Sequence, residues 1–304
     1  MNFRDFLHPK YWTTWLAYFV VRSLLALPLP IWQRIGIFLG HISYHCAKKR
    51  RHITEINIKM AFPNLPAEKQ QQLVKKTLIN TTLGVLESFY SWWGKDSDLK
   101  PRSEVRNLDT LLQAKAKGGV IIMGAHFTTL DLSGRVMAIN QKVDIVYKKQ
   151  RNKLFNAIMH RYRSPHYNEM IEKKDMRSMV KRLKQGEIVW YAPDQDFGRK
   201  GAVFAPFFGI ETANLSNIGK LVKLTGASVV FFSHFREGFG KSTRFVGHVS
   251  PLFENGVSDN EQENAAIFNA ALEKSLKDHH PSQYFWVHKR FKTRPIPGTA
   301  NPYK

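Results

Sequence analysis

One stretch of the chain combines the residue types that general base catalysis needs. His126 comes shortly after the apolar run 120–123, which predicts a short buried strand. Asp131 lies five residues after His126, in a segment that a threonine pair could cap as a helix. A carboxylate that holds a histidine in one tautomer makes the ring a better base. The spacing therefore predicts a His126–Asp131 pair where a strand gives way to a helix, a place where open α/β sheets bind ligands.

The sequence places no evident nucleophile beside this pair. Ser133 lacks the GxSxG context that presents a catalytic serine, and Cys46, the single cysteine, lies in an apolar helical stretch that indicates packing. No HExxH sequence or cluster of Cys and His occurs, so a metal is not implied. We therefore expect the pair to activate a hydroxyl of the substrate. A structural role for His126 stays open here, because a histidine five residues before an acid often occurs by chance.

Alternating strands and helices must position these residues. Apolar runs predict further strands, and helical spacing of apolar residues predicts the helices that separate them. The fold class expected is α/β, with a mostly parallel sheet flanked by helices and an N-terminal hydrophobic membrane-anchoring helix. The strands are expected at 143–147, 187–192, 228–234 and 243–249, and the helices at 107–117, 152–162, 176–184, 212–225 and 260–277.

The N-terminal part of the chain is hydrophobic. Residues 1–47 are expected to form a membrane anchor and an amphipathic helix, and residues 48–304 the catalytic domain. The mostly apolar segment 11–29 would measure roughly 28 Å as a helix, close to the roughly 30 Å of bilayer hydrocarbon. Arg22 lies inside this segment, so a single membrane span and a helix lying in the interface both stay open. Apolar spacing predicts the second helix over 31–47.

The charge of the chain is strongly unbalanced. Its 46 Lys and Arg against 24 Asp and Glu give a formal net charge of +22. Such an excess predicts an anionic partner, which is a nucleic acid, an acidic membrane or an acidic protein. The block Lys48–Arg51 follows the hydrophobic region, as is typical of cytoplasmic segments that face anionic lipid. Near the C-terminus, Arg290, Lys292 and Arg294 are interpreted either as a charged surface for that partner or as structural.

Four features in chain order resemble a known family. They are the His126–Asp131 pair, Arg163 in the sequence HRYRS, the segment Val189–Asp194 and the run Gln283–Pro295. Together they resemble the lysophospholipid acyltransferase superfamily and, within it, the late acyltransferases of bacterial lipid A biosynthesis. The resemblance covers nearly the whole chain, and its last two segments are the most specific.

This resemblance implies roles for particular residues. His126 would be the general base and Asp131 its orienting partner. Arg163 and Asp194 would bind substrate, with Arg161 as the alternative to Arg163. The chemistry agrees with this assignment, because acyl transfer from a thioester to an alcohol needs an activated hydroxyl and a place for the oxyanion.

The resemblance also implies the reaction and the partners. A fatty acyl chain, lauroyl by this resemblance, would pass from acyl-acyl carrier protein to a hydroxyl of a phosphorylated precursor of the Kdo-lipid IVA type. The enzyme would lie on the bacterial inner membrane with its catalytic domain facing the cytoplasm. No cofactor is expected, because the acyl carrier protein enters as the donor substrate. Myristoyl or palmitoleoyl transfer is an alternative within the family.

Two alternatives come from other classes of protein. A catalytically inactive lipid-binding scaffold would not need the intact pair of histidine and carboxylate. A basic nucleic-acid-binding protein would gather its basic residues with exposed aromatic residues on one binding surface. Here the basic residues are spread along the chain and no recognised nucleic-acid motif occurs, so no nucleic-acid partner is expected.

Overall fold

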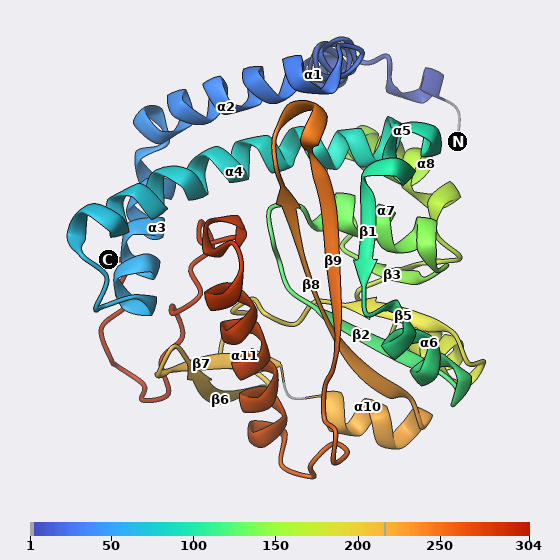
Figure 1. Ribbon diagram of the computed structural model, residues 1–304, viewed down its shortest axis with the longest axis vertical. Coiled ribbons are helices and arrows are strands. Elements are labelled where there is room, and N and C mark those ends of the chain that lie inside the picture. Colours follow the sequence, from blue (N-terminus) through green and yellow to red (C-terminus); the bar gives the residue numbers. More distant parts are fainter. Residues whose placement is uncertain (1–2, 216) are drawn as a thin grey trace.

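The chain forms an α/β fold around a seven-stranded sheet (Figure 1). This computed structural model describes residues 3–215 and 217–304. The strand order is β1-β9-β8-β2-β5-β3-β4, and every neighbouring pair is parallel except β8 and β9. The predicted mostly parallel sheet flanked by helices is therefore confirmed. The strands are β1 (Ser103–Arg106), β2 (Val120–Gly124), β3 (Asp144–Tyr147), β4 (Met170–Glu172), β5 (Ile188–Tyr191), β8 (Ser228–Glu237) and β9 (Arg244–Pro251).

Helices cover both faces of this sheet. In the central strand β2, Ile121 and Met123 pack into a core that includes residues of α9, α10 and α11, whereas Val120 and Ile122 pack into one that includes residues of α6 and α7. Burial on both faces explains why β2 reads as an uninterrupted apolar run. These helices are α6 (Leu108–Ala116), α7 (Leu130–Asn140), α9 (Met176–Lys184), α10 (Ile218–Thr225) and α11 (Glu261–Asp278).

A small antiparallel hairpin lies outside the main sheet. It pairs β6 (Ala202–Phe207) with β7 (Ile210–Leu215). Phe208 and Gly209 both have positive φ, at 51° and 72°, as a two-residue hairpin turn requires. The helix predicted over 212–225 is therefore wrong in its first part, because α10 begins only at Ile218. Residues 212–215 pair with β6, which lies outside the predicted helix, and this strand pairing overrides the helical spacing of their apolar residues.

The longest helix connects the N-terminal helices to the body of the protein. Helix α4 (Ala67–Trp93) has 27 residues and spans about 40 Å at about 1.5 Å per residue. It packs against both α2 (Leu29–Cys46) and α7. At Gly84, an added Cβ would lie 2.2 Å from the carbonyl oxygen of Thr128, so only glycine permits this approach. The loop after His126 therefore packs closely against α4. Three further helices are α3 (Lys48–Ala61), α5 (Asp96–Leu99) and α8 (Lys153–Arg163).

The hydrophobic N-terminal segment does not form one long helix. It divides into α1 (Trp12–Leu25) and α2 (Leu29–Cys46), with Pro28 as the N-cap of α2. Across the described ranges, no helix combines the length and the apolar character that crossing a membrane demands. The predicted transmembrane helix is therefore not supported. The guanidinium of Arg22, which interrupts the apolar pattern, lies 5.2 Å from the centre of the Trp93 ring in α4.

Helix α2 packs along the body of the protein. The Trp32 side chain is 1% exposed, and Gln33 accepts hydrogen bonds from the Gly240 amide and the Thr243 hydroxyl. The chain bends after Cys46, and α3 begins at Lys48. The domain boundary after residue 47 stays a prediction, although it coincides with this bend.

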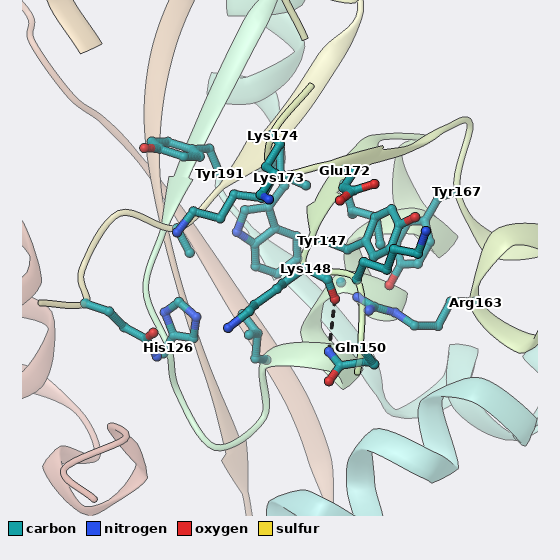
Figure 2. Close-up of a pocket in the computed structure, with 18 of the residues that line it drawn as sticks. His126, Tyr147, Lys148, Gln150, Arg163, Tyr167, Glu172, Lys173, Lys174 and Tyr191 are labelled. Atoms are coloured by element: carbon teal, nitrogen blue, oxygen red, sulfur yellow. Dashed lines mark hydrogen bonds between the residues drawn. The ribbon is translucent and has the colours of Figure 1, made fainter. Parts of the chain in front are cut away.

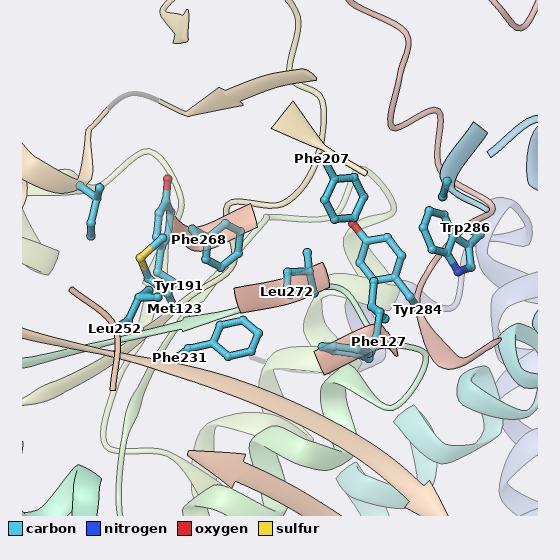
Figure 3. Close-up of a cluster of buried hydrophobic side chains, with 14 of the residues drawn as sticks. Met123, Phe127, Tyr191, Phe207, Phe231, Leu252, Phe268, Leu272, Tyr284 and Trp286 are labelled. Atoms are coloured by element: carbon cyan, nitrogen blue, oxygen red, sulfur yellow. The ribbon is translucent and has the colours of Figure 1, made fainter. Parts of the chain in front are cut away.

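The C-terminal run, residues 283–295, contributes side chains to the main core (Figure 3). Tyr284 and Trp286 are buried there beside Phe127 and Phe207. The side chain of Asn57 in α3 donates hydrogen bonds to the carbonyl oxygens of Trp286 and His288, at 2.6 and 2.7 Å. This run is therefore part of the core of the fold.

Arg290 belongs to this buried framework. Its side chain is 1% exposed and donates hydrogen bonds to the Ala213 carbonyl and the Asn214 side chain of β7, at 2.9 and 2.8 Å. Its guanidinium also lies 5.2 Å from the centre of the Phe207 ring. The interpretation of Arg290 as a charged surface is wrong, and the structural alternative is confirmed for this residue. The physical reason is that β7 supplies hydrogen-bond acceptors to the buried guanidinium of Arg290.

Candidate active site

His126 is held by a buried carboxylate. Its Nδ1 atom lies 2.6 Å from Asp194 Oδ1, and its backbone amide donates to Asp194 Oδ2 at 2.9 Å. The Tyr284 hydroxyl donates to the same Oδ2 at 3.0 Å. Asp194 is 1% exposed, whereas the His126 side chain is 26% exposed and lines a pocket. Because Nδ1 points to Asp194, Nε2 is the ring nitrogen that a substrate can reach.

The sheet brings these two residues together. In the parallel pair of β2 and β5, Met123 lies opposite Tyr191. His126 and Asp194 each follow these partners by three residues, in the loops that leave the carboxyl ends of the two strands. Adjacent loops at this edge are where ligand sites form in open α/β sheets. The His126–Asp194 pair is therefore a consequence of strand register.

Burial and charge act in opposite directions on this pair. Burial by itself lowers the pKa of His126, but the attraction of Asp194 and its hydrogen bond outweigh burial, so that the pKa is raised above its ordinary value. Burial by itself raises the pKa of Asp194, but the charge and hydrogen bonds of His126 hold it below its ordinary value. Burial and the neighbouring Asp194 charge raise the pKa of Tyr284 well above 10, so it stays a hydrogen-bond donor. The site thus stabilises an imidazolium, the form that a general base takes after it accepts a proton.

Asp131 does not hydrogen-bond to His126 in this structure. Its Oδ1 atom pairs with Arg163 Nη2 at 2.9 Å, and its charge contributes only the weakest of the effects that raise the pKa of His126. The expectation that Asp131 orients the imidazole is therefore corrected, and Asp194 occupies that position. The reason is that Asp131 lies inside α7, whereas Asp194 follows the strand adjacent to β2.

Arg163 reaches the pocket from the end of α8. Its side chain is 16% exposed, lines the pocket and pairs with Asp131. Arg161 is exposed on the same helix and is not among the pocket-lining residues. Of the two arginines that sequence analysis left as alternatives, Arg163 is the one beside the site.

The pocket around His126 is strongly cationic (Figure 2). It has a volume of about 880 Å³. Lysines from two loops, including Lys148 after β3 and Lys173 after β4, extend into it together with Arg163. Glu172 is the single carboxylate in the described lining. Such a pocket suits an anionic substrate, because phosphate groups bind clusters of Lys and Arg. Its cationic residues are Lys148, Lys149, Arg151, Lys153, Arg163, Lys173 and Lys174.

Another part of the same pocket is apolar. Leu130 and Gly134 of α7 line it together with Ile145 and Trp190 of the sheet. Gly134 leaves little spare room, since an added Cβ would lie 2.6 Å from the Tyr167 hydroxyl oxygen. The pocket therefore joins a cationic region to an apolar region beside one base, as a substrate with a charged head and a hydrocarbon chain requires.

The residue types that line the pocket indicate which group His126 could activate. Among the lining residues that the structure describes, none is serine, threonine or cysteine. The Ser133 hydroxyl instead donates to the Leu130 carbonyl at 2.8 Å, and Cys46 lies exposed at the end of α2. The geometry therefore favours direct activation of a substrate hydroxyl.

A second set of contacts holds the loop that carries Asp194. Asp196 accepts hydrogen bonds from the amide and hydroxyl of Thr293, at 2.7 and 2.8 Å. The amide of Asp196 donates to His288 Nε2 at 3.2 Å, and burial lowers the pKa of His288 to about 4. A neutral His288 can accept this bond. Hydrogen bonds from the C-terminal run therefore hold the loop that carries Asp194 in place.

Sequence reasoning missed two parts of the site. Tyr284 lies in the C-terminal run that was singled out, but nothing local to it indicates that its hydroxyl meets Asp194. The lysines carried a usable signal, because Lys148–Lys149 directly follow one predicted strand and Lys173–Lys174 precede a predicted helix. Basic pairs at the carboxyl ends of parallel strands converge on one edge of the sheet.

Comparisons with known proteins agree over nearly the whole chain. A family model described as bacterial lipid A biosynthesis acyltransferase matches residues 2–293. The lipid A biosynthesis palmitoleoyltransferase of Escherichia coli (strain K12) is 34% identical over 295 residues, covering 96% of this chain and 95% of that protein. The lipid A biosynthesis lauroyltransferase of the same strain is 32% identical over 291 residues, covering 95% and 94%. A lipid A biosynthesis acyltransferase of Haemophilus influenzae is 34% identical over 303 residues, covering 98% and 96%.

Proposed function

This chain belongs to the bacterial lipid A biosynthesis acyltransferase family, and we propose that it acylates a phosphorylated, Kdo-bearing lipid A precursor with acyl-acyl carrier protein as the donor. The chain is accordingly an acyltransferase that acts on a lipid A precursor. The identity of the donor, the catalytic pair and the length of the acyl chain are the parts that we propose.

The single observation that carries the proposal is the composition of the pocket. His126, with Nδ1 bound to Asp194, lines a space that joins seven cationic side chains to an apolar wall. The cations suit the phosphates of the acceptor, and the apolar wall suits the acyl chain. The described lining contains no serine, threonine or cysteine, which suits direct transfer between two bound substrates.

The proposed reaction is a direct transfer. The acceptor hydroxyl gives its proton to His126 Nε2 as its oxygen attacks the carbonyl carbon of the thioester. An ester bond forms, the carbon–sulfur bond breaks, and the sulfur leaves with the proton that His126 held. Asp194 stabilises the imidazolium between these two steps. Arg163, paired with Asp131, and the lysines stabilise the negative charge of phosphate or of the tetrahedral intermediate.

For the acyl chain we propose lauroyl, with palmitoleoyl as the second candidate. The resemblance of the sequence to the lauroyl acyltransferase supports lauroyl, whereas identity favours neither candidate, since the lauroyltransferase and the palmitoleoyltransferase are 32% and 34% identical to this chain. Competition between donors of 12, 14 and 16 carbons on the purified enzyme decides between the candidates. The proposed lauroyl assignment fails if a longer donor has the highest kcat/KM.

We place the enzyme on the cytoplasmic face of the inner membrane, held by α1 and α2. Trp12, Leu16 and Phe19 of α1 are 63%, 66% and 59% exposed, and Phe38 of α2 is 64% exposed. Exposed apolar residues on amphipathic helices support a helix that lies in the interface. Lys48 and Lys49 are exposed after α2 and suit anionic lipid, whereas Arg50 and Arg51 donate hydrogen bonds to the carbonyls of Val287 and Tyr44.

Mass spectrometry of lipid A tests the proposed function. A strain that lacks this gene should accumulate a precursor that is short of one acyl chain, and the wild-type gene should restore it. His126→Ala should fail to restore it while the protein still accumulates. Unchanged lipid A in the deletion strain, or full restoration by His126→Ala, contradicts the proposal.

A further inference from the structure

A second, open groove lies between α9 and α10, apart from the catalytic pocket. It has a volume of about 600 Å³ and is lined along α9 from Met176 to Gln185, with Leu224 of α10 opposite. Met176 and Leu224 are 40% and 56% exposed, so apolar surface of both helices faces solvent. We call this surface the α9–α10 groove.

The α9–α10 groove has a strongly positive edge. Arg177, Lys181 and Lys184 line it and lie four and then three residues apart, so they share one face of α9. All three are exposed. No carboxylate belongs to the described lining of the groove. An apolar strip beside a row of cations is complementary to an amphipathic helix with an acidic face.

The groove begins where the catalytic pocket ends. Lys173 and Lys174 line the catalytic pocket, and Met176 and Arg177 line the groove. Met176 lies three positions after Lys173, a distance of at most about 11 Å along the chain. A protein seated in the groove would therefore present a flexible prosthetic arm at the entrance to the pocket that contains His126.

We propose that the α9–α10 groove is the docking site for the acyl carrier protein, with an acidic helix of the carrier lying along α9. This inference rests on the proposed function, in which that acidic protein is the acyl donor. Arg177, Lys181 and Lys184 pair with its carboxylates, while Met176 and Leu224 contact its apolar residues. Charges at the edge of an interface mainly govern the association rate and its salt dependence.

The position of the groove separates it from the surface assigned to the membrane. In Figure 1, α10 lies at the opposite end of the molecule from α1 and α2. A carrier bound at α10 would therefore approach from the side away from the lipid. This arrangement favours a soluble acidic protein over anionic lipid as the occupant of the groove.

The test is charge reversal on α9, in the variant Arg177→Glu/Lys181→Glu/Lys184→Glu. We expect the KM for acyl-acyl carrier protein to rise about tenfold or more at low salt, with kcat nearly unchanged. The KM for the lipid acceptor should stay the same. Turnover of acyl-pantetheine, a small thioester without the acidic protein, should also stay the same. Leu224→Asp, which places an acid in the apolar strip, should raise the KM for acyl-acyl carrier protein as well. This variant provides the test if the triple variant does not fold.

The matched control reverses Lys69, Lys75 and Lys76 on α4, which are exposed and give the same change of net charge. This control should keep the wild-type KM for the carrier. An unchanged KM in the α9 variant overturns the docking site and leaves the proposed function intact. Loss of binding to phosphatidylglycerol vesicles without a change in this KM also overturns it, in favour of a membrane surface. A wild-type enzyme that uses acyl-pantetheine but not the acylated carrier refutes the proposed donor, and the docking site with it.

Discussion

His126 and Asp194 are 68 residues apart in the sequence and occupy corresponding positions after neighbouring parallel strands. Their hydrogen bond, 2.6 Å between Nδ1 and Oδ1, links the loops that leave β2 and β5. The hydroxyl of Tyr284 and the amide of His126 both donate to the other carboxylate oxygen of Asp194. The proposed base is therefore oriented by a carboxylate that the sheet and the C-terminal run hold in place together.

Replacement of Asp194 should impair catalysis more than replacement of Asp131. Asp194→Asn removes the charge that stabilises the imidazolium, so kcat should fall by about 10²–10⁴-fold. Asp131→Asn keeps the His126–Asp194 bond and loosens Arg163, so the larger part of its effect should be on the KM for the acceptor. Steady-state kinetics on both folded variants measure this difference. A larger fall in kcat for Asp131→Asn than for Asp194→Asn would restore Asp131 as the orienting carboxylate.

Activity should rise with pH through the raised pKa of His126. A general base must be neutral to accept a proton, and Asp194 raises this pKa above the ordinary value of about 6.5. The enzyme should therefore be weakly active at pH 6 and reach its plateau above neutrality. In Asp194→Asn the inflection should move to lower pH, because burial then acts without the opposing charge. An inflection that stays in place would show that another group controls the profile.

Transfer should proceed without an acyl-enzyme. The described pocket lining contains no serine, threonine or cysteine, so initial-rate kinetics should follow a sequential pattern. Cys46→Ser should keep full activity, because Cys46 lies exposed at the end of α2. Incubation with a radiolabelled acyl donor and no acceptor, followed by denaturation, provides the direct measurement. A stoichiometric covalent label that depends on His126 is the result that this mechanism forbids.

Gly134 should limit the length of the acyl chain. A Cβ there would lie 2.6 Å from the Tyr167 hydroxyl oxygen and 3.2 Å from Trp190 Cζ3, so Gly134→Ala must push side chains into the pocket. We expect kcat/KM to fall about tenfold or more for the preferred donor relative to one that is two carbons shorter. Gly134→Ala/Tyr167→Phe, which removes the crowded hydroxyl, should recover part of the preference. An equal fall for every chain length argues against a limit at this position.

Exposed apolar residues of α1 should hold the enzyme on lipid. Leu16→Gln/Phe19→Gln should reduce co-sedimentation with anionic vesicles and leave the melting temperature unchanged, since both side chains are more than half exposed. Lys48→Gln/Lys49→Gln should weaken binding chiefly at low salt, because screening acts over about 10 Å at 0.1 M. Vesicle binding that neither variant changes would move the membrane contact to another surface.

The local features of this protein could be predicted from its sequence. The apolar run 120–123 predicted the strand, and burial of β2 on both faces is the reason that this pattern was so clear. The helix over 176–184 was predicted with its observed bounds, because α9 packs one apolar face and carries its charges on the other. The position of His126 at the end of a strand followed from the same local pattern.

Tertiary structure alone decided which side chains meet. Asp131 is closer to His126 in the sequence, but the register between β2 and β5 places Asp194 beside His126. Asp131 instead forms an ion pair with Arg163. The burial of Arg290 likewise depends on hydrogen-bond acceptors in β7, 76 or more positions away along the chain. Propensity and periodicity act over a few residues, whereas strand register and hydrogen bonds between distant segments depend on the packing of the whole chain. For this reason the sequence located the loop that carries His126, and only the fold determined which residues contact it.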